Sequence, residues 1–263
     1  FESAHLTYRH YSQLKMADLA ELIPTENWVE DLRAVKDSSE IELMEKAASI
    51  ADDAVEKMVE QIRPGMTEQE VANRINALIR SLGGKKEAFD LIVASGPRSA
   101  MPHGTSSDRE IQAGEPIVID IGTQFEGYHS DLTRTIWLDK IESSQLVELY
   151  EIVENAQAAA IGAIRPDMSC VEVDAVARNL IAEAGYGEQF GHGLGHGVGL
   201  EVHEAPVISQ LGKGKVKPGM VFTVEPGIYI PDVGGVRIED MVVVDGTGCR
   251  RLTKSPHRPG ITI

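Results

Sequence analysis

The sequence contains little cysteine, no long hydrophobic run and few positive charges. Its two cysteines among 263 residues, Cys170 and Cys249, form no spacing motif, which argues against a thiolate metal site and favours a reducing, cytosolic setting. No apolar run is long enough to cross a bilayer, and the first residues show no signal-peptide pattern. The net charge of -16 argues against a nucleic-acid partner, because phosphate binding needs a basic face.

The length is sufficient for a large core, either in one large α/β domain or in two smaller ones. Residues 1–30 are polar, include Pro24 and show no hydrophobic period. We therefore interpret residues 1–30 as a connector or the remnant of a missing N-terminal domain. The first residue is Phe1 rather than Met, which is expected of a fragment of a longer protein. Residues 31–263 are then expected to form the main folded domain.

Hydrophobic periodicity predicts helices and strands in the remaining chain. Ser39 and Glu42 match a capping box, a helical apolar stripe follows, and Pro64-Gly65 ends the predicted helix. A buried strand is expected over 89–94 and a long helix over about 144–164. Helices and strands therefore occur in one mixed domain.

Three features of the first half recur in the second half, in the same order. The offsets drift from 102 to 108 residues: 62–67 recurs at 164–169, 114–120 at 219–225, and Asp131 at Glu239. A single similarity of this kind would carry little weight. Three similar segments in the same order predict two halves with one helix-helix-strand-hairpin plan.

Two carboxylates face each other in the first predicted hairpin. A turn centred between Phe125 and Glu126 would make Asp120 and Asp131 cross-strand partners. Such partners have Cβ atoms about 5 Å apart, and like charges there repel each other. The pair therefore needs either a cation between the two acids or a proton shared by them.

The second half repeats this arrangement with Glu225 and Glu239, which pair across a turn centred on Asp232. Two hairpins related by a pseudo-twofold axis would bring four carboxylates together, which is strongly destabilising without cations. Two divalent ions would balance the charge. Taken singly, each acid has a simpler interpretation as a strand-end or turn residue.

Glycine alternates with larger side chains over residues 191–199, which disfavours a helix and predicts an extended strand. In a strand, His192, Leu194, His196 and Val198 would share one face, and the glycine face would let other backbone approach closely. No phosphate-binding or dinucleotide-binding spacing accompanies these glycines.

Four segments resemble the metal-dependent proline peptidases of the pita-bread fold, which are prolidase (Xaa-Pro dipeptidase) and aminopeptidase P. The segments are Asp131-Leu-Thr-Arg, Gly195-His-Gly-Val-Gly-Leu-Glu-Val-His-Glu, Val224-Glu-Pro-Gly-Ile-Tyr and Val236-Arg-Ile-Glu-Asp. The resemblance extends from about residue 35 to the end. It implies an α+β pita-bread catalytic domain over 31–263, with pseudo-twofold duplicated halves around a curved antiparallel sheet.

The resemblance also implies a set of metal ligands. In the family, the positions of Asp120, Asp131, His196, Glu225 and Glu239 hold two divalent ions, with Asp131 and Glu239 bridging. This oxygen-rich set suits Mn²⁺ and accepts Co²⁺, Zn²⁺ or Fe²⁺. Such an ion pair lowers the pKa of a bridging water, and the resulting hydroxide would attack the carbonyl before proline.

Further roles follow from the same resemblance. Glu225 would move a proton to the leaving nitrogen, His203 and His192 would bind the carbonyl or oxyanion, His103 would contact the substrate backbone, and Arg237 and Tyr229 would line the proline side. The implied substrates are proline-containing di- or oligopeptides, without nucleic-acid or membrane partners. We expect a cytoplasmic protein and, for a full-length form with the family's further N-terminal domain, a homodimer.

Three other functions share this fold. A methionine aminopeptidase has the same ligands, but the sequences around Glu225 and Arg237 resemble the proline branch. Creatinase and non-catalytic binding modules would be expected to have lost ligands that are all present here. The sequence leaves dipeptidase and aminopeptidase specificity open, because that choice depends on what closes the space around the peptide.

Overall fold

The computed structural model describes residues 1–18 and 20–261. The helices are α1 (Tyr8–Ala17), α2 (Trp28–Ala34), α3 (Ser38–Gln61), α4 (Glu68–Ser81), α5 (Ser144–Ala163) and α6 (Cys170–Glu183), with 3-10 helices η1 (Gly96–Ala100) and η2 (Gly187–Gln189). The strands are β1 (Lys86–Glu87), β2 (Ile92–Ser95), β3 (Ile117–Ile121), β4 (Thr123–Phe125), β5 (Tyr128–His129), β6 (Leu132–Leu138), β7 (Gly195–Gly197), β8 (Glu204–Ile208), β9 (Val221–Val224), β10 (Gly227–Ile230), β11 (Gly234–Arg237), β12 (Asp240–Val244), β13 (Cys249–Arg251) and β14 (Gly260–Ile261).

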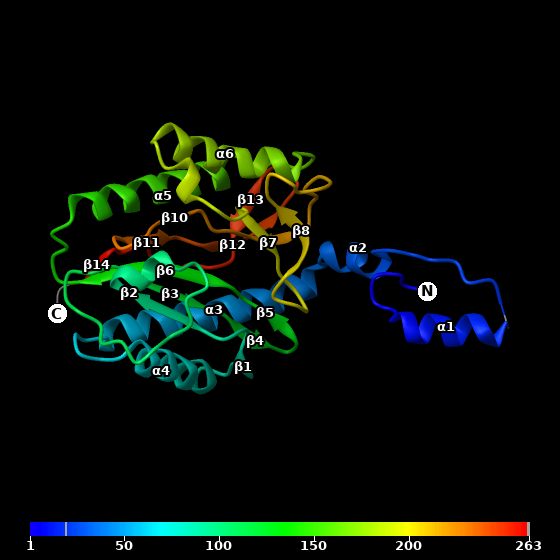
Figure 1. Ribbon diagram of the computed structural model, residues 1–263, viewed down its shortest axis with the longest axis horizontal. Helices are drawn as coiled ribbons and strands as arrows, with labels where there is room; N and C mark the ends of the chain where they lie inside the picture. Colours follow the sequence, from blue (N-terminus) through cyan, green and yellow to red (C-terminus); the bar gives the residue numbers. More distant parts are fainter. Residues whose placement is uncertain (19, 262–263) are drawn as a thin grey trace.

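The predicted duplication is visible in the arrangement of these elements. Strands β2, β3 and β6 are neighbours in one sheet, and β9 lies between β7 and β12 in the other. Helices α3 and α4 cover the first sheet, and α5 and α6 cover the second, so that the sheets lie between two helical layers (Figure 1). Each half also buries its own apolar cluster between its helices and strands. The structure therefore confirms the mixed α+β class.

The second helix of each half begins in the same way. Thr67 and Glu70 form a capping box at the start of α4, and Ser169 and Glu172 form one at the start of α6. Both helices are 14 residues long. The two ends are thus stabilised by the same reciprocal hydrogen bonds between the capping side chains and backbone N–H groups.

Two local predictions were wrong in position. The capping box of α3 is formed by Asp37 and Glu40, two residues before the predicted pair of Ser39 and Glu42. The Ser39 hydroxyl donates to the Asp37 carboxylate instead, at 2.7 Å. The predicted strand over 89–94 is shorter and lies later, in β2.

The register of the first hairpin also differs from the prediction. Asp120 lies opposite Thr133, not opposite Asp131. Glu126 and Gly127 both adopt positive φ, which is typical of a two-residue hairpin turn and moves its centre one residue later. This change slides the register by two residues, so both acids keep the same face of the sheet.

The second hairpin follows the predicted register. Val224 pairs with Asp240 and Gly227 pairs with Arg237, so the register on both sides places Glu225 opposite Glu239. Asp232, at the turn, has a φ of 64°. The two halves join where Thr133 and Glu239 form an isolated antiparallel bridge.

The N-terminal arm, which consists of the described residues before α2, projects away from the body of the molecule, with α1 farther out than α2 (Figure 1). Helix α1 has no buried residue.

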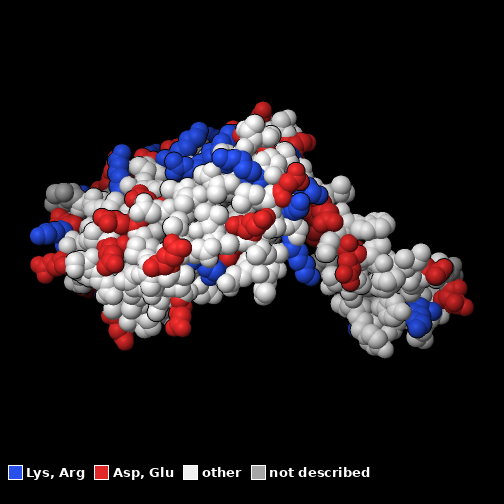
Figure 2. All heavy atoms as spheres, turned by 90° about the horizontal axis from the view of Figure 1, so that it is seen from above, with Lys and Arg blue, Asp and Glu red and all other residues white. Residues whose placement is uncertain are grey.

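On the face that Figure 2 shows, acidic side chains are spread over the surface rather than gathered in one patch. Among the helices of the described residues, none combines the length and hydropathy that a membrane crossing requires.

Candidate metal centre and active site

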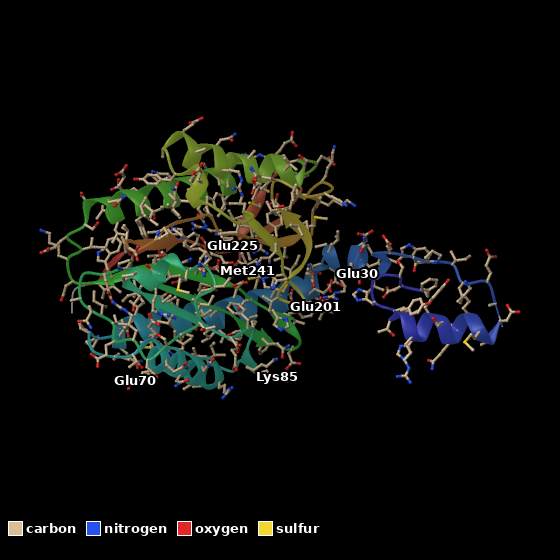
Figure 3. The ribbon with its side chains drawn as sticks, in the orientation of Figure 1. Glu30, Glu70, Lys85, Glu201, Glu225 and Met241 are labelled. Atoms are coloured by element: carbon tan, nitrogen blue, oxygen red, sulfur yellow. The ribbon has the colours of Figure 1, made fainter. Side chains whose placement is uncertain are left out.

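A cavity of about 470 Å³ opens where the two halves meet. Nine of the predicted site residues line it: His103, Asp120, Asp131, His192, His196, His203, Glu225, Arg237 and Glu239. They come from both halves, and Glu225 lies near the middle of the body between the two helical layers (Figure 3). The junction of the repeats is thus the candidate site.

Three residues from three separate segments meet at the acidic part of this cavity. Ligand atoms of Asp131, His196 and Glu239 all lie within 4.8 Å of one another. The Nε2 atom of His196 is 3.6 Å from Asp131 Oδ2 and 3.4 Å from Glu225 Oε1. This grouping of carboxylate oxygens around one imidazole is compact enough to surround a cation.

The acids of this cluster are electrostatically strained. Burial raises the pKa of Asp131 well above its usual range, and the charges of Glu239 and Asp120 raise it further. Burial and the charges of Glu225 and Asp120 likewise raise the pKa of Glu239. Burial raises the pKa of Glu225 to about 7. Each ionised acid would therefore gain stability from a nearby positive charge.

One arginine supplies part of that charge. Arg237 donates from Nη2 to Asp120 Oδ2 at 2.6 Å, whereas the buried Oδ1 atom of the same carboxylate has no hydrogen-bond partner among the described residues. A single guanidinium cannot balance four carboxylates. The unpartnered oxygen and the remaining negative charge therefore fit a site for divalent ions.

The orientation of His196 suits metal binding. Its Nδ1 atom lies 3.1 Å from the carbonyl oxygen of Gly197, which can only accept a hydrogen bond. The proton of the neutral ring is therefore on Nδ1, and Nε2 presents its lone pair to the acids. Burial also lowers the pKa of His196, which favours this neutral form.

His192 has a hydrogen-bond partner at each of its ring nitrogens. Its Nδ1 atom lies 2.8 Å from the carbonyl oxygen of Gly193, and its Nε2 atom lies 3.1 Å from the hydroxyl of Tyr229. Burial lowers the pKa of His192 to about 4, so the ring is neutral near pH 7. Its single N–H donates to Gly193 and its other nitrogen accepts from Tyr229, which leaves no proton for a substrate carbonyl.

Tyr229 lies behind the cavity wall. Its hydroxyl accepts from Arg237 Nη1 at 2.9 Å and donates to His192, and its side chain is buried. Tyr229 therefore connects Arg237 and His192.

His103 and His203 are both exposed side chains on loops that border the cavity, and the ring of His203 lies 4.2 Å from that of His196, centre to centre.

The predicted glycine-rich strand is only three residues long, and its pairing register is broken after His196. His192 and His196 line the cavity, but Leu194 and Val198 pack into two different apolar clusters. The prediction that all four share one face was therefore wrong. The close backbone approach was correct, because a Cβ atom at Gly195 would collide with the carbonyl of Thr223.

Two hydroxyl groups orient the acids from behind. The Thr133 hydroxyl donates to Glu239 Oε2 at 2.6 Å and accepts from Arg237 Nε at 3.0 Å. The Thr223 hydroxyl donates to Glu225 Oε1 at 3.0 Å. These bonds fix the side chains that line the site.

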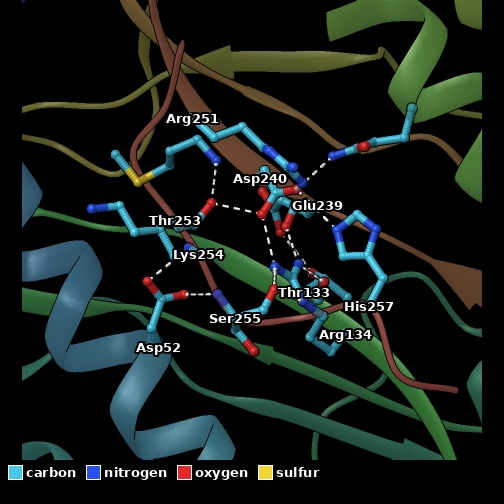
Figure 4. A network of polar contacts seen from close by, with 12 residues as sticks. Asp52, Thr133, Arg134, Glu239, Asp240, Arg251, Thr253, Lys254, Ser255 and His257 are labelled. Atoms are coloured by element: carbon cyan, nitrogen blue, oxygen red, sulfur yellow. Dashed lines mark hydrogen bonds and ion pairs between the residues drawn. The ribbon is translucent and has the colours of Figure 1, made fainter. Parts of the chain in front are cut away.

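A buried ionic network supports the Glu239 backbone (Figure 4). Arg134 donates to the Glu239 carbonyl at 2.6 Å and to Asp240 Oδ1 at 2.8 Å. Burial alone would raise the pKa of Asp240, but Arg134 and His257 hold it well below its usual range. Arg134 and Asp240 lie inside the motifs at 131–134 and 236–240, where the sequence gives them no separate signal, and His257 lies outside both motifs.

The duplicated fold, with carboxylates and a neutral imidazole converging between its halves, defines a metallohydrolase. The pattern of metallopeptidase family M24 matches residues 42–246. The chain is 47% identical over 251 residues to the Xaa-Pro dipeptidase of Pyrococcus horikoshii, covering 95% of this chain and 71% of that protein. The chain belongs to metallopeptidase family M24 and is a pita-bread metallopeptidase of the prolidase type.

Solved structures support the same assignment. An Xaa-Pro dipeptidase from Bacillus anthracis is similar with a TM-score of 0.96 and 47% identity, covering 100% of this chain and 74% of that chain. An X-Pro aminopeptidase from Thermotoga maritima has a TM-score of 0.92 and 40% identity, with the same coverage of 100% and 74%. The pita-bread fold expected from the sequence is therefore confirmed.

Proposed function

We propose that this protein hydrolyses the peptide bond that precedes proline, as an Xaa-Pro dipeptidase or Xaa-Pro aminopeptidase. The observation that carries the proposal is the convergence of Asp131, His196 and Glu239 in a cavity between the two halves. The names of similar proteins support it, since both specificities occur among them.

Five residues would hold two divalent ions: Asp120, Asp131, His196, Glu225 and Glu239. Mn²⁺ suits this oxygen-rich set, and Co²⁺, Zn²⁺ or Fe²⁺ would also be accepted. When bound, such ions polarise the scissile carbonyl and lower the pKa of water so that a nucleophile forms at neutral pH.

Glu225 is suited to move a proton. It lines the cavity beside His196, and the bond from Thr223 holds its Oε1 atom in place. We assign to Glu225 the transfer of a proton to the leaving proline nitrogen, which has no hydrogen of its own in the peptide.

The remaining side chains would bind and orient the peptide. His203 lies beside His196 and would donate to the carbonyl or oxyanion, and His103 would contact the substrate backbone. Because both nitrogens of His192 are engaged, we assign it to the cavity wall rather than to oxyanion binding. Arg237 would line the proline side, with Tyr229 holding its guanidinium from behind.

The cellular setting belongs to the same proposal. A reducing cytoplasm is compatible with the two free cysteines, of which Cys170 is buried and Cys249 is partly buried. Residues 1–30 would connect the catalytic domain to a further N-terminal domain, and the full-length form would be a homodimer, as the resemblance implies.

The test is hydrolysis of Ala-Pro, Ala-Pro-Ala and Met-Ala by protein that has been stripped with a chelator and reloaded with Mn²⁺. We expect cleavage of at least one proline peptide, little cleavage of Met-Ala, and loss of activity without metal. Preference for Ala-Pro would indicate a dipeptidase, and preference for Ala-Pro-Ala an aminopeptidase.

A pair of variants separates the site from the rest of the molecule. Asp131→Ala should abolish activity and metal pairing and keep the fold, whereas Asp53→Ala, which changes an exposed acid on α3, should leave activity unchanged. Full hydrolysis by Asp131→Ala, or no cleavage of either proline peptide by the metal-loaded protein, would exclude the proposed function.

A further inference from the structure

Glu68 is a buried acid outside the predicted metal centre. It is the first residue of α4, and none of its surface is exposed. Its Oε1 atom accepts from the backbone N–H of Ser95 at 2.8 Å and from the Ser95 hydroxyl at 2.9 Å. Its Oε2 atom accepts from Arg98 Nε at 3.0 Å, and from the N–H and hydroxyl of Ser107 at 3.1 and 2.6 Å. A carboxylate this fully bonded is held in one orientation.

The five hydrogen bonds join both ends of one loop. Ser95 and Arg98 lie at the start of residues 95–107, and Ser107 lies at the end. The middle of this loop carries His103, which is exposed but borders the cavity. An exposed loop tip has few packing contacts of its own, so its position depends on how its ends are fixed.

A second contact joins the loop to the site itself. The Nη1 atom of Arg237 donates to the carbonyl of Pro102, the residue before His103, at 3.1 Å. The loop is therefore attached to α4 at its base and to the predicted substrate wall near its tip.

The internal repeat shows that α4 does not need this acid as a helix. At the offset of 102 residues, the counterpart of Glu68 is Cys170, the first residue of α6. That helix has the same length and the same type of capping box. Since Cys170 is equally buried, the start of such a helix accepts a small uncharged residue. The carboxylate of Glu68 is therefore explained by its hydrogen bonds to residues 95–107 rather than by the helix.

The second half holds its histidine segment with an acid at another position. Asp174 on α6 accepts from Leu194 N–H at 3.0 Å and pairs with Arg178 at 2.7 Å. Arg178 donates to the carbonyl of His192 at 2.7 Å. The counterpart of Asp174 in α4 is Ala72, so this anchor is absent from the first half at that position. Helix α4 thus fixes the segment that carries His103, and α6 fixes the segment that carries His192. The acids that do so, Glu68 and Asp174, stand at different positions of the repeat.

We propose that Glu68 is a positioning residue, whose buried carboxylate fixes residues 95–107 and thereby holds His103 at the cavity. This inference rests on the proposed function, because it assigns to His103 a contact with the peptide. The contact itself belongs to His103, and Glu68 acts through the loop.

The test replaces Glu68 by the residue that the other half uses, as Glu68→Cys, with Gln69→Cys as the matched control on an exposed neighbour. With Mn²⁺-loaded protein, Glu68→Cys should lower kcat/KM for Ala-Pro at least tenfold, and the control should retain wild-type values. Glu68→Gln should restore part of the loss, because one acceptor oxygen remains for Ser95. In a His103→Ala background, Glu68→Cys should cause no further loss, because residues acting through one contact are not additive.

A readout that needs no activity keeps the two proposals distinguishable. Trypsin should cleave after Arg98 faster in Glu68→Cys than in the wild type or in Gln69→Cys, at a temperature where circular dichroism shows each protein folded. Unchanged cleavage, or a loss in the double variant equal to the product of the single losses, would overturn the positioning role. If the wild type cleaves no Xaa-Pro peptide but the trypsin result holds, the proposed function fails and the loop anchor stands. Should Glu68→Cys not fold, Glu68→Gln carries both measurements.

Discussion

Thr133 shows how much of the site depends on a single buried hydroxyl. It is fully buried, accepts from Arg237 and donates to Glu239, so it fixes a proposed ligand and a proposed substrate residue together. Groups behind metal ligands commonly change metal affinity or activity by about 10–100-fold when removed.

We therefore expect Thr133→Val, which keeps the shape and removes the hydroxyl, to reduce activity or Mn²⁺ affinity by roughly 10–100-fold. Thr133→Ser keeps the hydroxyl and should stay close to wild type. Titration of metal-free protein with Mn²⁺, followed by activity, measures both effects. Equal behaviour of the two variants would show that the hydroxyl does not orient Glu239.

Two arginines that contact Asp240 provide a matched pair for stability. The side chain of Arg134 is 3% exposed and donates to Asp240 at 2.8 Å, whereas that of Arg251 is 51% exposed and lies 3.4 Å from the same carboxylate. Breaking a buried pair costs about 3–5 kcal/mol, because a charge is left unpaired, but an exposed pair is worth at most about 1 kcal/mol.

Arg134→Met should therefore lower the free energy of unfolding by about 3–5 kcal/mol, and Arg251→Met by at most about 1 kcal/mol. Urea denaturation at neutral pH measures both values. Similar losses in the two variants would contradict the difference in burial as the cause.

At the scale of helices and strands, the sequence predicted the elements whose signals are local. The capping box at Thr67, the long helix α5 and the repeat of two halves are as expected, because turn residues and hydrophobic period are read from neighbouring positions. The register of the first hairpin was wrong, since it depended on which residues take positive φ at Glu126 and Gly127. The predicted and the observed register both place Asp120 and Asp131 on one face of the sheet, so the prediction of the site did not depend on this error.

The candidate site was predictable as a set of residues, but its supporting contacts were not. Glu68, Asp174 and Arg178 are charged residues on helices, and by pattern alone they resemble solvent-facing positions. Their contacts depend on loops that return from 12 to 39 positions away, as the bonds from Arg98 to Glu68 and from Arg178 to His192 show. Such long-range pairing leaves no local signal.

The N-terminal arm leads to a prediction about domain boundaries. Helix α1 buries no residue, but Lys36, just before α3, is buried and donates to Glu204 at 2.6 Å. Removing residues 1–26 should change the free energy of unfolding by at most about 1 kcal/mol. Lys36→Met should lower it by about 1.5–3 kcal/mol, because it removes one of the two cationic partners of Glu204 and leaves Arg33 as the other. Urea denaturation of both proteins checks this, and a large loss in the truncated chain would place the arm within the domain.

At the scale of the whole molecule, the duplication has an electrostatic consequence. Each half contributes two of the four carboxylates in the cavity, so the closeness of the halves is opposed by charge repulsion. The same packing buries the apolar clusters of both sheets and the bridge between Thr133 and Glu239. In the metal-free protein, repulsion between these acids should therefore lower the free energy of unfolding by an amount that depends on pH.

The sign of this dependence follows from the pKa shifts. Folding raises the pKa of Asp131 and Glu239, and raises that of Glu225 to about 7, above the unfolded value of roughly 4. Near neutral pH the unfolded chain has already released these protons, so further ionisation in the folded state lowers stability as pH rises. The histidines, whose pKa is lowered by burial, have the opposite effect, but that effect ends above the unfolded value of about 6.5.

We therefore expect the melting temperature of chelator-treated protein to fall between about pH 7.5 and pH 8.5, where the histidines of the unfolded chain have almost finished titrating and the raised acids have not. Added Mn²⁺ should raise it, and should raise it more at the higher pH, because ionised carboxylates bind the ions and their repulsion is relieved. Asp131→Asn, which removes one charge, should weaken the decline. Scanning calorimetry with and without Mn²⁺ measures this, and a metal-free melting temperature that stays constant or rises across the window would mean that the four acids are not held together at a cost.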